Sequence, residues 1–215
     1  METVTRGGLK EMFSYVATEM AENSDKLTEM DALLGDGDLG LTMKKGFAAL
    51  PELIDAADEA DIGRVIAKSG MKLASIVPST MGFLMSSGLM TGGKAISGAE
   101  SIGAVEFCKF LRGYADGIVK RGKCAPGDRT VLDAIDSAAA CAEKLLDENG
   151  TASLPAVAEA AEKGAEIGVE ATRSMKPKYG KAAVHAAAAE GTIDQGAYAG
   201  LCLVRGIRKY VQLCK

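Results

Sequence analysis

Three aspartates in one short segment are the residues of this chain best suited to chemistry. Asp31, Asp36 and Asp38 lie within Asp-Ala-Leu-Leu-Gly-Asp-Gly-Asp, so their carboxylates occur at positions i, i+5 and i+7. Like charges this close repel one another and raise each other's pKa unless a cation neutralises them. The intervening glycines allow the backbone to turn tightly enough for the carboxylates to converge. Hard oxygen ligands favour Mg²⁺, Mn²⁺ or Ca²⁺ over zinc, so the pattern predicts a divalent-cation site.

Two other interpretations of this segment are a calcium loop of the EF-hand type and an acidic turn that caps the following helix. An EF-hand needs a bidentate glutamate at its twelfth loop position. Counting from Asp36, that position is Phe47, so the calcium-loop interpretation fails. A capping turn is ordinary chemistry for Asp-Gly-Asp and stays open as the alternative.

The residues after the aspartates suit an anion. Gly40-Leu41-Thr42-Met43 opens a helical pattern, and a helix N-terminus presents unpaired N–H groups and the positive end of the helix dipole. Because Mg²⁺ is usually held by one or two carboxylates plus substrate phosphates, three carboxylates could hold two ions that share a nucleotide's phosphate oxygens. The P-loop pattern Gly-x-x-x-x-Gly-Lys-Ser/Thr is missing, so a phosphate site here is of another kind.

Composition and charge limit the classes of protein to which the chain can belong. Its 215 residues are 47% hydrophobic with a formal net charge of -4, and no internal boundary is visible, so we expect a single domain over residues 1–215. Acidic and basic residues are mixed and no basic stripe with interleaved aromatics occurs, which argues against nucleic acid as a partner. The amino terminus has no apolar leader and the most apolar segment, 81–90, is too short to cross a bilayer. We therefore expect no membrane association and a cytoplasmic location.

The cysteines and the single histidine give no catalytic signal. Five cysteines form no Cys-x-x-Cys pair, so we expect reduced thiols, with Cys108, Cys141 and Cys202 as small core residues. His185 is the only histidine, which excludes a His-based triad, and its alanine-rich surroundings predict a structural role.

Helical periodicity recurs along the chain, whereas alternating strand patterns are absent over any useful length. Eight helices are expected, at about 9–20, 42–50, 62–77, 80–96, 104–118, 131–146, from Ser153 onward, and 197–211. Ser153 and Pro155 supply an N-cap and an early-turn proline for the seventh helix. Short joins and alanine-rich faces predict an all-α fold, an eight-helix antiparallel bundle or barrel.

Placed on this helical pattern, three segments resemble the nucleotide-binding L subunit of dihydroxyacetone kinases. Residues 30–38 match the family's Asp, four residues, Asp-Gly-Asp-His-Gly pattern. Residues 121–133 are close to its Gly-Asp-Lys-Thr-Met segment, and residues 193–197 to its Asp-Pro-Gly-Ala. The resemblance covers essentially the whole chain and identifies it as a DhaL-like nucleotide-binding domain.

The resemblance implies an eight-helix barrel with ADP or ATP at one end and two Mg²⁺ on Asp31, Asp36 and Asp38. The residues that it assigns to the nucleotide are Leu39, Gly40, Leu41, Thr42, Thr80, Gly122, Val131, Lys181, Asp194 and Gly196. No covalent catalyst is implied, because a separate K subunit holds the ketose. The phosphoryl donor is either ATP itself or a phosphotransferase-type subunit that rephosphorylates a resident ADP.

The chain departs from the family pattern near the expected phosphates. Leu39 stands in place of the family's histidine, Pro78 and Met81 change its glycine- and serine-rich loop, and Lys181 stands in place of an arginine. A point-charge lysine does not reproduce a bidentate guanidinium. The leading hypothesis is a phosphotransfer subunit of a dihydroxyacetone-kinase-type system. The alternative is a divergent, non-catalytic paralogue with a regulatory or protein-interaction role.

Overall fold

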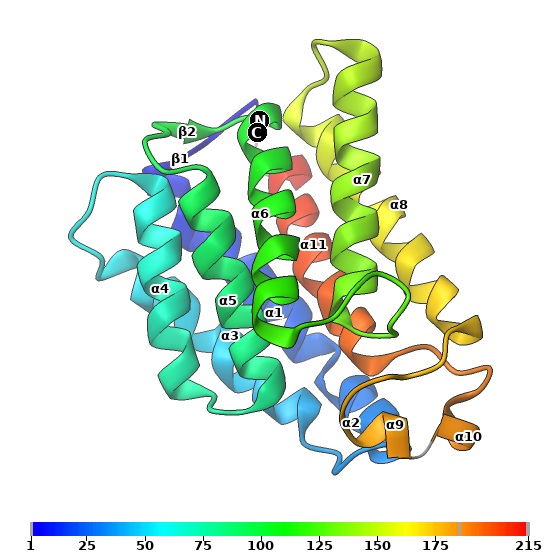
Figure 1. Cartoon of the computed structure of the whole chain (residues 1–215). Helices are drawn as coiled ribbons and strands as arrows, with labels where there is room; N and C mark the ends of the chain where they lie inside the picture. Colours follow the sequence, from blue (N-terminus) through cyan, green and yellow to red (C-terminus); the bar gives the residue numbers. More distant parts are fainter. Residues whose placement is uncertain (1, 185, 214–215) are drawn as a thin grey trace.

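The computed structural model describes residues 2–184 and 186–213, and they form an all-α fold with one short pair of strands (Figure 1). His185 and Cys214, for which the sequence predicts a structural role and a reduced thiol, lie outside the described residues. The α-helices are α1 (Leu9–Glu22), α2 (Ser24–Ala32), α3 (Leu39–Asp55), α4 (Ile62–Ile76), α5 (Thr80–Ala95), α6 (Ala104–Gly122), α7 (Val131–Asn149), α8 (Leu154–Ala171), α9 (Gly180–Val184), α10 (Ala186–Ala189) and α11 (Gln195–Leu213). The strands are β1 (Val4–Thr5) and β2 (Ser101–Ile102), and 3-10 turns cover Arg6–Gly8 and Thr172–Ser174.

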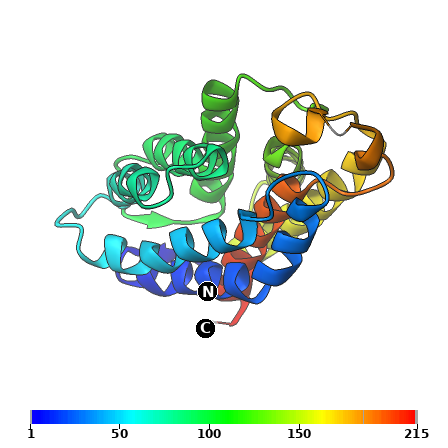
Figure 2. The same cartoon turned by 90° about the horizontal axis from the view of Figure 1, so that it is seen from below.

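Eight long helices form a closed ring. Following the ring, α1 packs on α3, then come α4, α5, α6, α7, α8 and α11, and α11 packs on α1 again. Figures 1 and 2 show this arrangement from the side and from below. These eight helices correspond to the eight that the sequence predicts, and the all-α, helical-barrel expectation is confirmed.

Local sequence explains where several of these helices begin. Ser153 accepts a hydrogen bond from the N–H of Ala156, so the predicted N-cap of α8 is confirmed, with Pro155 in the first turn. Ser79 does the same for α5 through the N–H of Gly82. Gly88 allows α5 to approach α6 closely, because a Cβ at this position would lie 2.1 Å from the ring of Tyr114.

The structure differs from the sequence expectation at three places. Helix α2 was not predicted, because Leu27 is its only buried apolar residue and the periodic signal is correspondingly weak. Helix α3 begins at Leu39, three residues before the expected Thr42, and runs to Asp55, with Pro51 inside it where the sequence predicts only a weak continuation. Strands β1 and β2 pair Val4 with Ile102, and two-residue strands are too short to show alternation.

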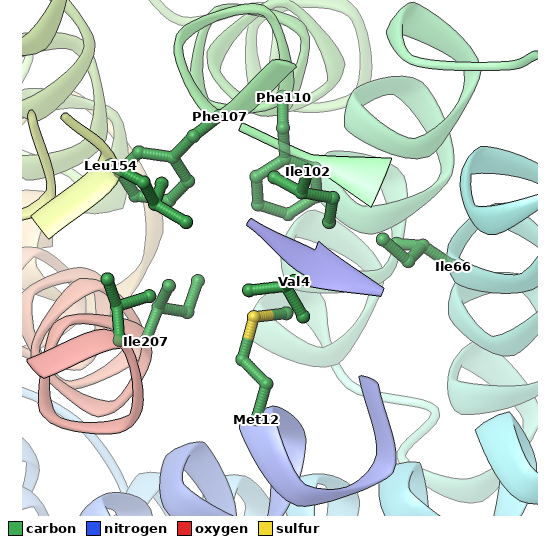
Figure 3. Close-up of a pocket in the computed structure, with 9 residues that line it drawn as sticks. Val4, Met12, Ile66, Ile102, Phe107, Phe110, Leu154 and Ile207 are labelled. Carbon is green, nitrogen blue, oxygen red and sulfur yellow. The ribbon is translucent and has the colours of Figure 1, made fainter. Parts of the chain in front are cut away.

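One end of the barrel is filled and apolar. The strand pair lies there, near both chain ends in Figure 1. Side chains from β1, β2 and five helices surround a cavity of about 10 Å³, the size of a single water. Figure 3 shows them pointing toward one another: Val4, Met12, Ile66, Ile102, Phe107, Phe110, Leu154 and Ile207. This end holds the barrel together and offers no polar group to a ligand.

The predicted core cysteines are confirmed for Cys108 and Cys202, which are buried, while Cys141 is half-buried. Among the described residues, every helix is too short or too polar to cross a membrane.

Candidate functional site

The opposite end of the barrel carries a polar cleft at which four helices begin. The first residues of α3, α5, α7 and α11, which are Leu39, Thr80, Val131 and Gln195, all line this cleft. Figure 1 shows α2, α9 and α10 gathered at the same end, and Figure 2 views the molecule from that side. The cleft has a volume of about 330 Å³ and is partly open to solvent. Because each helix N-terminus carries a partial positive charge, four of them together favour an anionic ligand.

The three predicted metal ligands meet on one wall of the cleft. One carboxylate oxygen from each of Asp31, Asp36 and Asp38 lies within 4.8 Å of the others. Asp31 is buried in the last turn of α2, and its Oδ2 accepts hydrogen bonds from the N–H groups of Asp38 (3.1 Å) and Leu39 (3.4 Å). These bonds fold the intervening loop back onto α2. The predicted convergence of the aspartates is therefore present in the structure.

Glycines make this loop possible. A Cβ on Gly35 would lie 2.5 Å from Oδ1 of Asp31, so a larger residue there would displace the carboxylate. Gly37 has a φ of 72°, in the left-handed region that other residues rarely adopt. The loop geometry thus depends on the glycines that the sequence places between the aspartates.

The three aspartates have different charged neighbours. Lys181 forms an ion pair with Asp36 and lowers the pKa of that carboxyl. Partial burial, together with the charges of Asp36 and Asp31, raises the pKa of Asp38. A divalent cation would remove this repulsion, and the all-oxygen donor set fits Mg²⁺. The residues present therefore fit the predicted metal site.

Side chains cap three of the four helices that begin at the cleft. Ser79 caps α5, Thr130 and Asp133 form a capping box on α7, and Oδ2 of Asp194 accepts from the N–H of Ala197 in α11. Helix α3 differs, because Asp38 precedes it without a capping hydrogen bond from its side chain. At the start of α3 the side-chain acceptor is instead Asp31, which lies seven residues before Asp38 and accepts from the N–H of Leu39.

Most of the predicted nucleotide residues line the cleft, namely Leu39, Thr42, Thr80, Val131, Lys181, Asp194 and Gly196. Gly40, Leu41 and Gly122 do not line it. Gly40 packs against α2, where an added Cβ would lie 1.9 Å from the carbonyl oxygen of Ser24, and Leu41 is 65% exposed. Gly122 ends α6 beside Leu84. For these three, a contact with nucleotide stays a prediction.

The cleft wall also contains residues that were not predicted as ligand contacts, among them Arg129, Tyr179 and Gln195. Arg129 donates from Nη2 to the carbonyl oxygen and Oγ1 of Thr192, both at 2.8 Å. The Tyr179 hydroxyl donates to the carbonyl oxygen of Lys123. Gln195 donates from Nε2 to Oδ1 of Asp31 at 3.3 Å and so supports a predicted metal ligand. Arg129 and Gln195 lie inside segments 121–133 and 193–197, which carry the family resemblance, whereas Tyr179 is signalled only by its closeness to Lys181.

The segment between α8 and α11 closes one side of the cleft. Lys178 forms an ion pair with buried Asp128, and Lys181 pairs with Asp36. Thr172 accepts from the N–H of Asp194 at 2.8 Å, which fixes the start of α11. The segment therefore connects the aspartate loop to the loop before α7, on either side of the cleft.

Comparison with known proteins agrees with this geometry. Residues 33–209 match the family model described as "DAK2 domain". The chain is 32% identical over 174 residues to the "PEP-dependent dihydroxyacetone kinase, ADP-binding subunit DhaL" of Escherichia coli K12, covering 81% of this chain and 82% of that protein. It is also 30% identical to the D-erythrulose kinase of Mycolicibacterium smegmatis, over 86% of this chain and 32% of that longer protein.

A solved structure shows the same fold. The dihydroxyacetone kinase from C. freundii, in complex with AMP-PNP and Mg²⁺, superposes with a TM-score of 0.68 at 20% identity. The match covers 97% of this chain, which spans about a third (35%) of that kinase chain. At this identity the likeness establishes the fold. Taken with the family match over most of its length, the chain belongs to the DAK2 domain family and is a DhaL-like member of it.

Proposed function

We propose that this protein is the phosphotransfer subunit of a dihydroxyacetone-kinase-type system. In this proposal the cleft binds ADP or ATP with two Mg²⁺ held by Asp31, Asp36 and Asp38. The phosphoryl group passes to a small ketose on a separate K subunit. The relatives named as ADP-binding subunits and as a kinase of a four-carbon ketose support this function.

The convergence of three carboxylates at the start of α3 carries the proposal. The aspartates supply oxygen ligands within 4.8 Å of one another, and the helix N-terminus beside them supplies N–H donors. This combination suits a metal-bound phosphate chain, since Mg²⁺ is commonly shared between carboxylates and phosphate oxygens. When bound, Mg²⁺ neutralises charge on the phosphate oxygens during transfer.

The chain's own residues would position the nucleotide. Gln195 holds the carboxylate of Asp31 in place, and Lys181 is close enough to Asp36 to contact phosphates beside it. In the transfer step a ketose hydroxyl oxygen bonds to the terminal phosphorus while the bond from that phosphorus to its bridging oxygen breaks. The hydroxyl proton leaves to a base or to water. Such a reaction depends chiefly on the positioning of the reacting groups and on neutralisation of the phosphate charge.

Exposed apolar side chains that neighbour cleft residues in sequence support docking of the K subunit here. Leu33, Leu41 and Val184 are 67%, 65% and 80% exposed, and each is within four positions of a residue that lines the cleft. Large exposed apolar side chains grouped around a site are typical of protein interfaces. We expect the protein to work beside this partner in the cytoplasm, with either ATP or a phosphotransferase-type subunit as donor.

The direct test is nucleotide analysis of the purified protein, followed by titration with ADP in Mg²⁺ and by reconstitution with a K subunit. Bound or tightly binding ADP and phosphorylation of dihydroxyacetone are expected. A chain that holds no nucleotide and binds none would overturn the proposal. That result would favour the divergent, non-catalytic paralogue, for which Leu39 and Met81 in the cleft wall are the relevant departures.

A further inference from the structure

Half of the buried side-chain polar atoms that lack a hydrogen-bond partner, among the described residues, belong to residues of the cleft. In the part of the chain that the structure describes, the buried side-chain atoms without a hydrogen-bond partner belong to Ser69, Ser86, Asp128, Arg129 and Gln195. The two serines are helical, and Asp128 is in an ion pair with Lys178. The remaining atoms, Nε and Nη1 of Arg129 and Oε1 of Gln195, come from residues that line the cleft. Such atoms are costly to bury unless a ligand completes their hydrogen bonds.

Arg129 is the more unusual of the two. Its side chain is almost fully buried, since the residue is only 3% exposed, yet Nη2 alone has partners, and both are neutral oxygens of Thr192. Its φ of 60° lies in the left-handed region, which is rare for a residue with a Cβ. Strained backbone of this kind is commonly found at functional sites.

The positive charge of Arg129 has no contact ion pair among the described residues. Nη2 donates to Thr192, and the other two nitrogens have no hydrogen-bond partner. Burial lowers the pKa of the guanidinium, and the charge of Asp194 acts in the opposite direction without being hydrogen-bonded to it. A buried charge without a partner is strongly unfavourable, so an anion in the cleft would contribute most at this position.

We propose that Arg129 is a phosphate-binding residue that donates from Nε or Nη1 to a phosphate oxygen of the nucleotide. This inference rests on the proposed function. The phosphates are the groups of a nucleotide that carry negative charge, and charge-assisted hydrogen bonds from arginine to phosphate are among the strongest. Arg129 acts alongside the aspartates, from the loop that precedes α7, and partly replaces the donors that Leu39 and Met81 do not provide.

The test compares Arg129→Met with Arg173→Met by calorimetric titration. Arg173 is the matched control, because it also holds the segment before α11, through a hydrogen bond to the carbonyl oxygen of Gly191. Mg²⁺ with ADP, and adenosine without phosphate, are the two probes. We expect Arg129→Met to weaken ADP binding about 10- to 100-fold, to leave adenosine binding unchanged and to keep the dependence on Mg²⁺. Arg173→Met should bind ADP normally.

A second readout separates ligand binding from structural support. Two donor nitrogens of Arg129 are unpaired without ligand, and removing them offsets the loss of the bonds to Thr192, so Arg129→Met should melt close to the unmodified protein. Equal ADP affinity in Arg129→Met, or an equal loss in Arg173→Met, would overturn the inference while the proposed function stands. Failure of the unmodified protein to bind ADP in Mg²⁺ would overturn the proposed function and this inference together.

Discussion

The two ends of the barrel are built from the same helices but differ in packing and polarity: one is filled by apolar side chains, and the other is an open polar cleft. At the strand-covered end, Phe107, Phe110 and their neighbours fill the interior to a cavity of about 10 Å³. At the other end, helix starts, carboxylates and a buried arginine surround a cleft of about 330 Å³. At the strand-covered end the apolar side chains pack against one another. At the cleft, hydrogen-bond donors and charged groups lack partners that a ligand can supply. The difference indicates that the residues that stabilise the fold and the residues that bind a ligand lie at separate ends.

Backbone direction contributes to this separation. Helices α3, α5, α7 and α11 all begin at the cleft, so their positive dipole ends point to the same place. Side chains at or next to the N-cap position cap three of them, whereas the first N–H of α3 bonds to Asp31 of the aspartate wall. The cleft therefore combines a negative wall with helix N-termini, an arrangement suited to a metal-bound anion.

The largest effect is expected at the apolar end. Phe107→Ala removes a fully packed ring and enlarges the cavity, which should lower the free energy of unfolding by about 3–5 kcal/mol. Urea denaturation measures this change. Affinity for ADP in Mg²⁺ should stay the same wherever the variant is folded. Loss of that affinity by a folded variant would show that the two ends are coupled.

A smaller effect is expected from Asp194 in the cleft, where burial raises its pKa from 3.8 to about 6. Arg129 acts to lower this pKa and Asp133 to raise it. Because the folded state binds the proton more tightly than the unfolded state, this group stabilises the fold fully below about pH 4 and loses its contribution as pH rises through about 6. The contribution is on the order of 2–3 kcal/mol.

Asp194→Asn isolates this contribution. The amide oxygen can still accept from the N–H of Ala197, so α11 keeps its cap. Subtracting the unfolding free energies of the variant from those of the unmodified protein between pH 4 and 7.5 should give a curve that falls as pH rises. A flat difference would show that Asp194 has an ordinary pKa.

The smallest expected effect is a gain of affinity. The triple variant Leu39→His, Pro78→Gly and Met81→Ser adds donors beside the expected phosphates and should bind ADP in Mg²⁺ at least about tenfold more tightly, or about 1.4 kcal/mol. Leu39 and Met81 line the cleft, so the new groups would face it. Tight binding by the unmodified chain with no gain in the variant would show that other groups, Arg129 first among them, already serve the phosphates.

The comparison of the two ends also explains what sequence could and could not predict. Long amphipathic helices and the spacing of Asp31, Asp36 and Asp38 are local patterns, and both were visible in the sequence. Helix α2 was missed because its stability comes from packing on α3, with Gly40 against Ser24, rather than from its own periodicity. The strand pair joins residues about a hundred positions apart through only two residues each.

Arg129 shows the same limit within the cleft. Its sequence neighbours Asp128 and Thr130 indicate a helix start, and that start is present. Arg129 is buried, has a left-handed backbone and bonds to Thr192, which lies 63 residues further along the chain. No local sequence pattern reveals these features. Gln195 is similar, since its contact with Asp31 joins the start of α11 to the end of α2.

The central claim is that the aspartate wall of the cleft binds a Mg²⁺-nucleotide. The most direct measurement is calorimetric titration of ADP, with Mg²⁺ and with chelator, into the unmodified protein, Asp36→Asn and a control, Asp116→Asn, whose aspartate is exposed on α6. We predict Mg²⁺-dependent binding that Asp36→Asn abolishes and Asp116→Asn preserves, with all three proteins equally folded. Mg²⁺-dependent binding of undiminished affinity in Asp36→Asn would contradict the account.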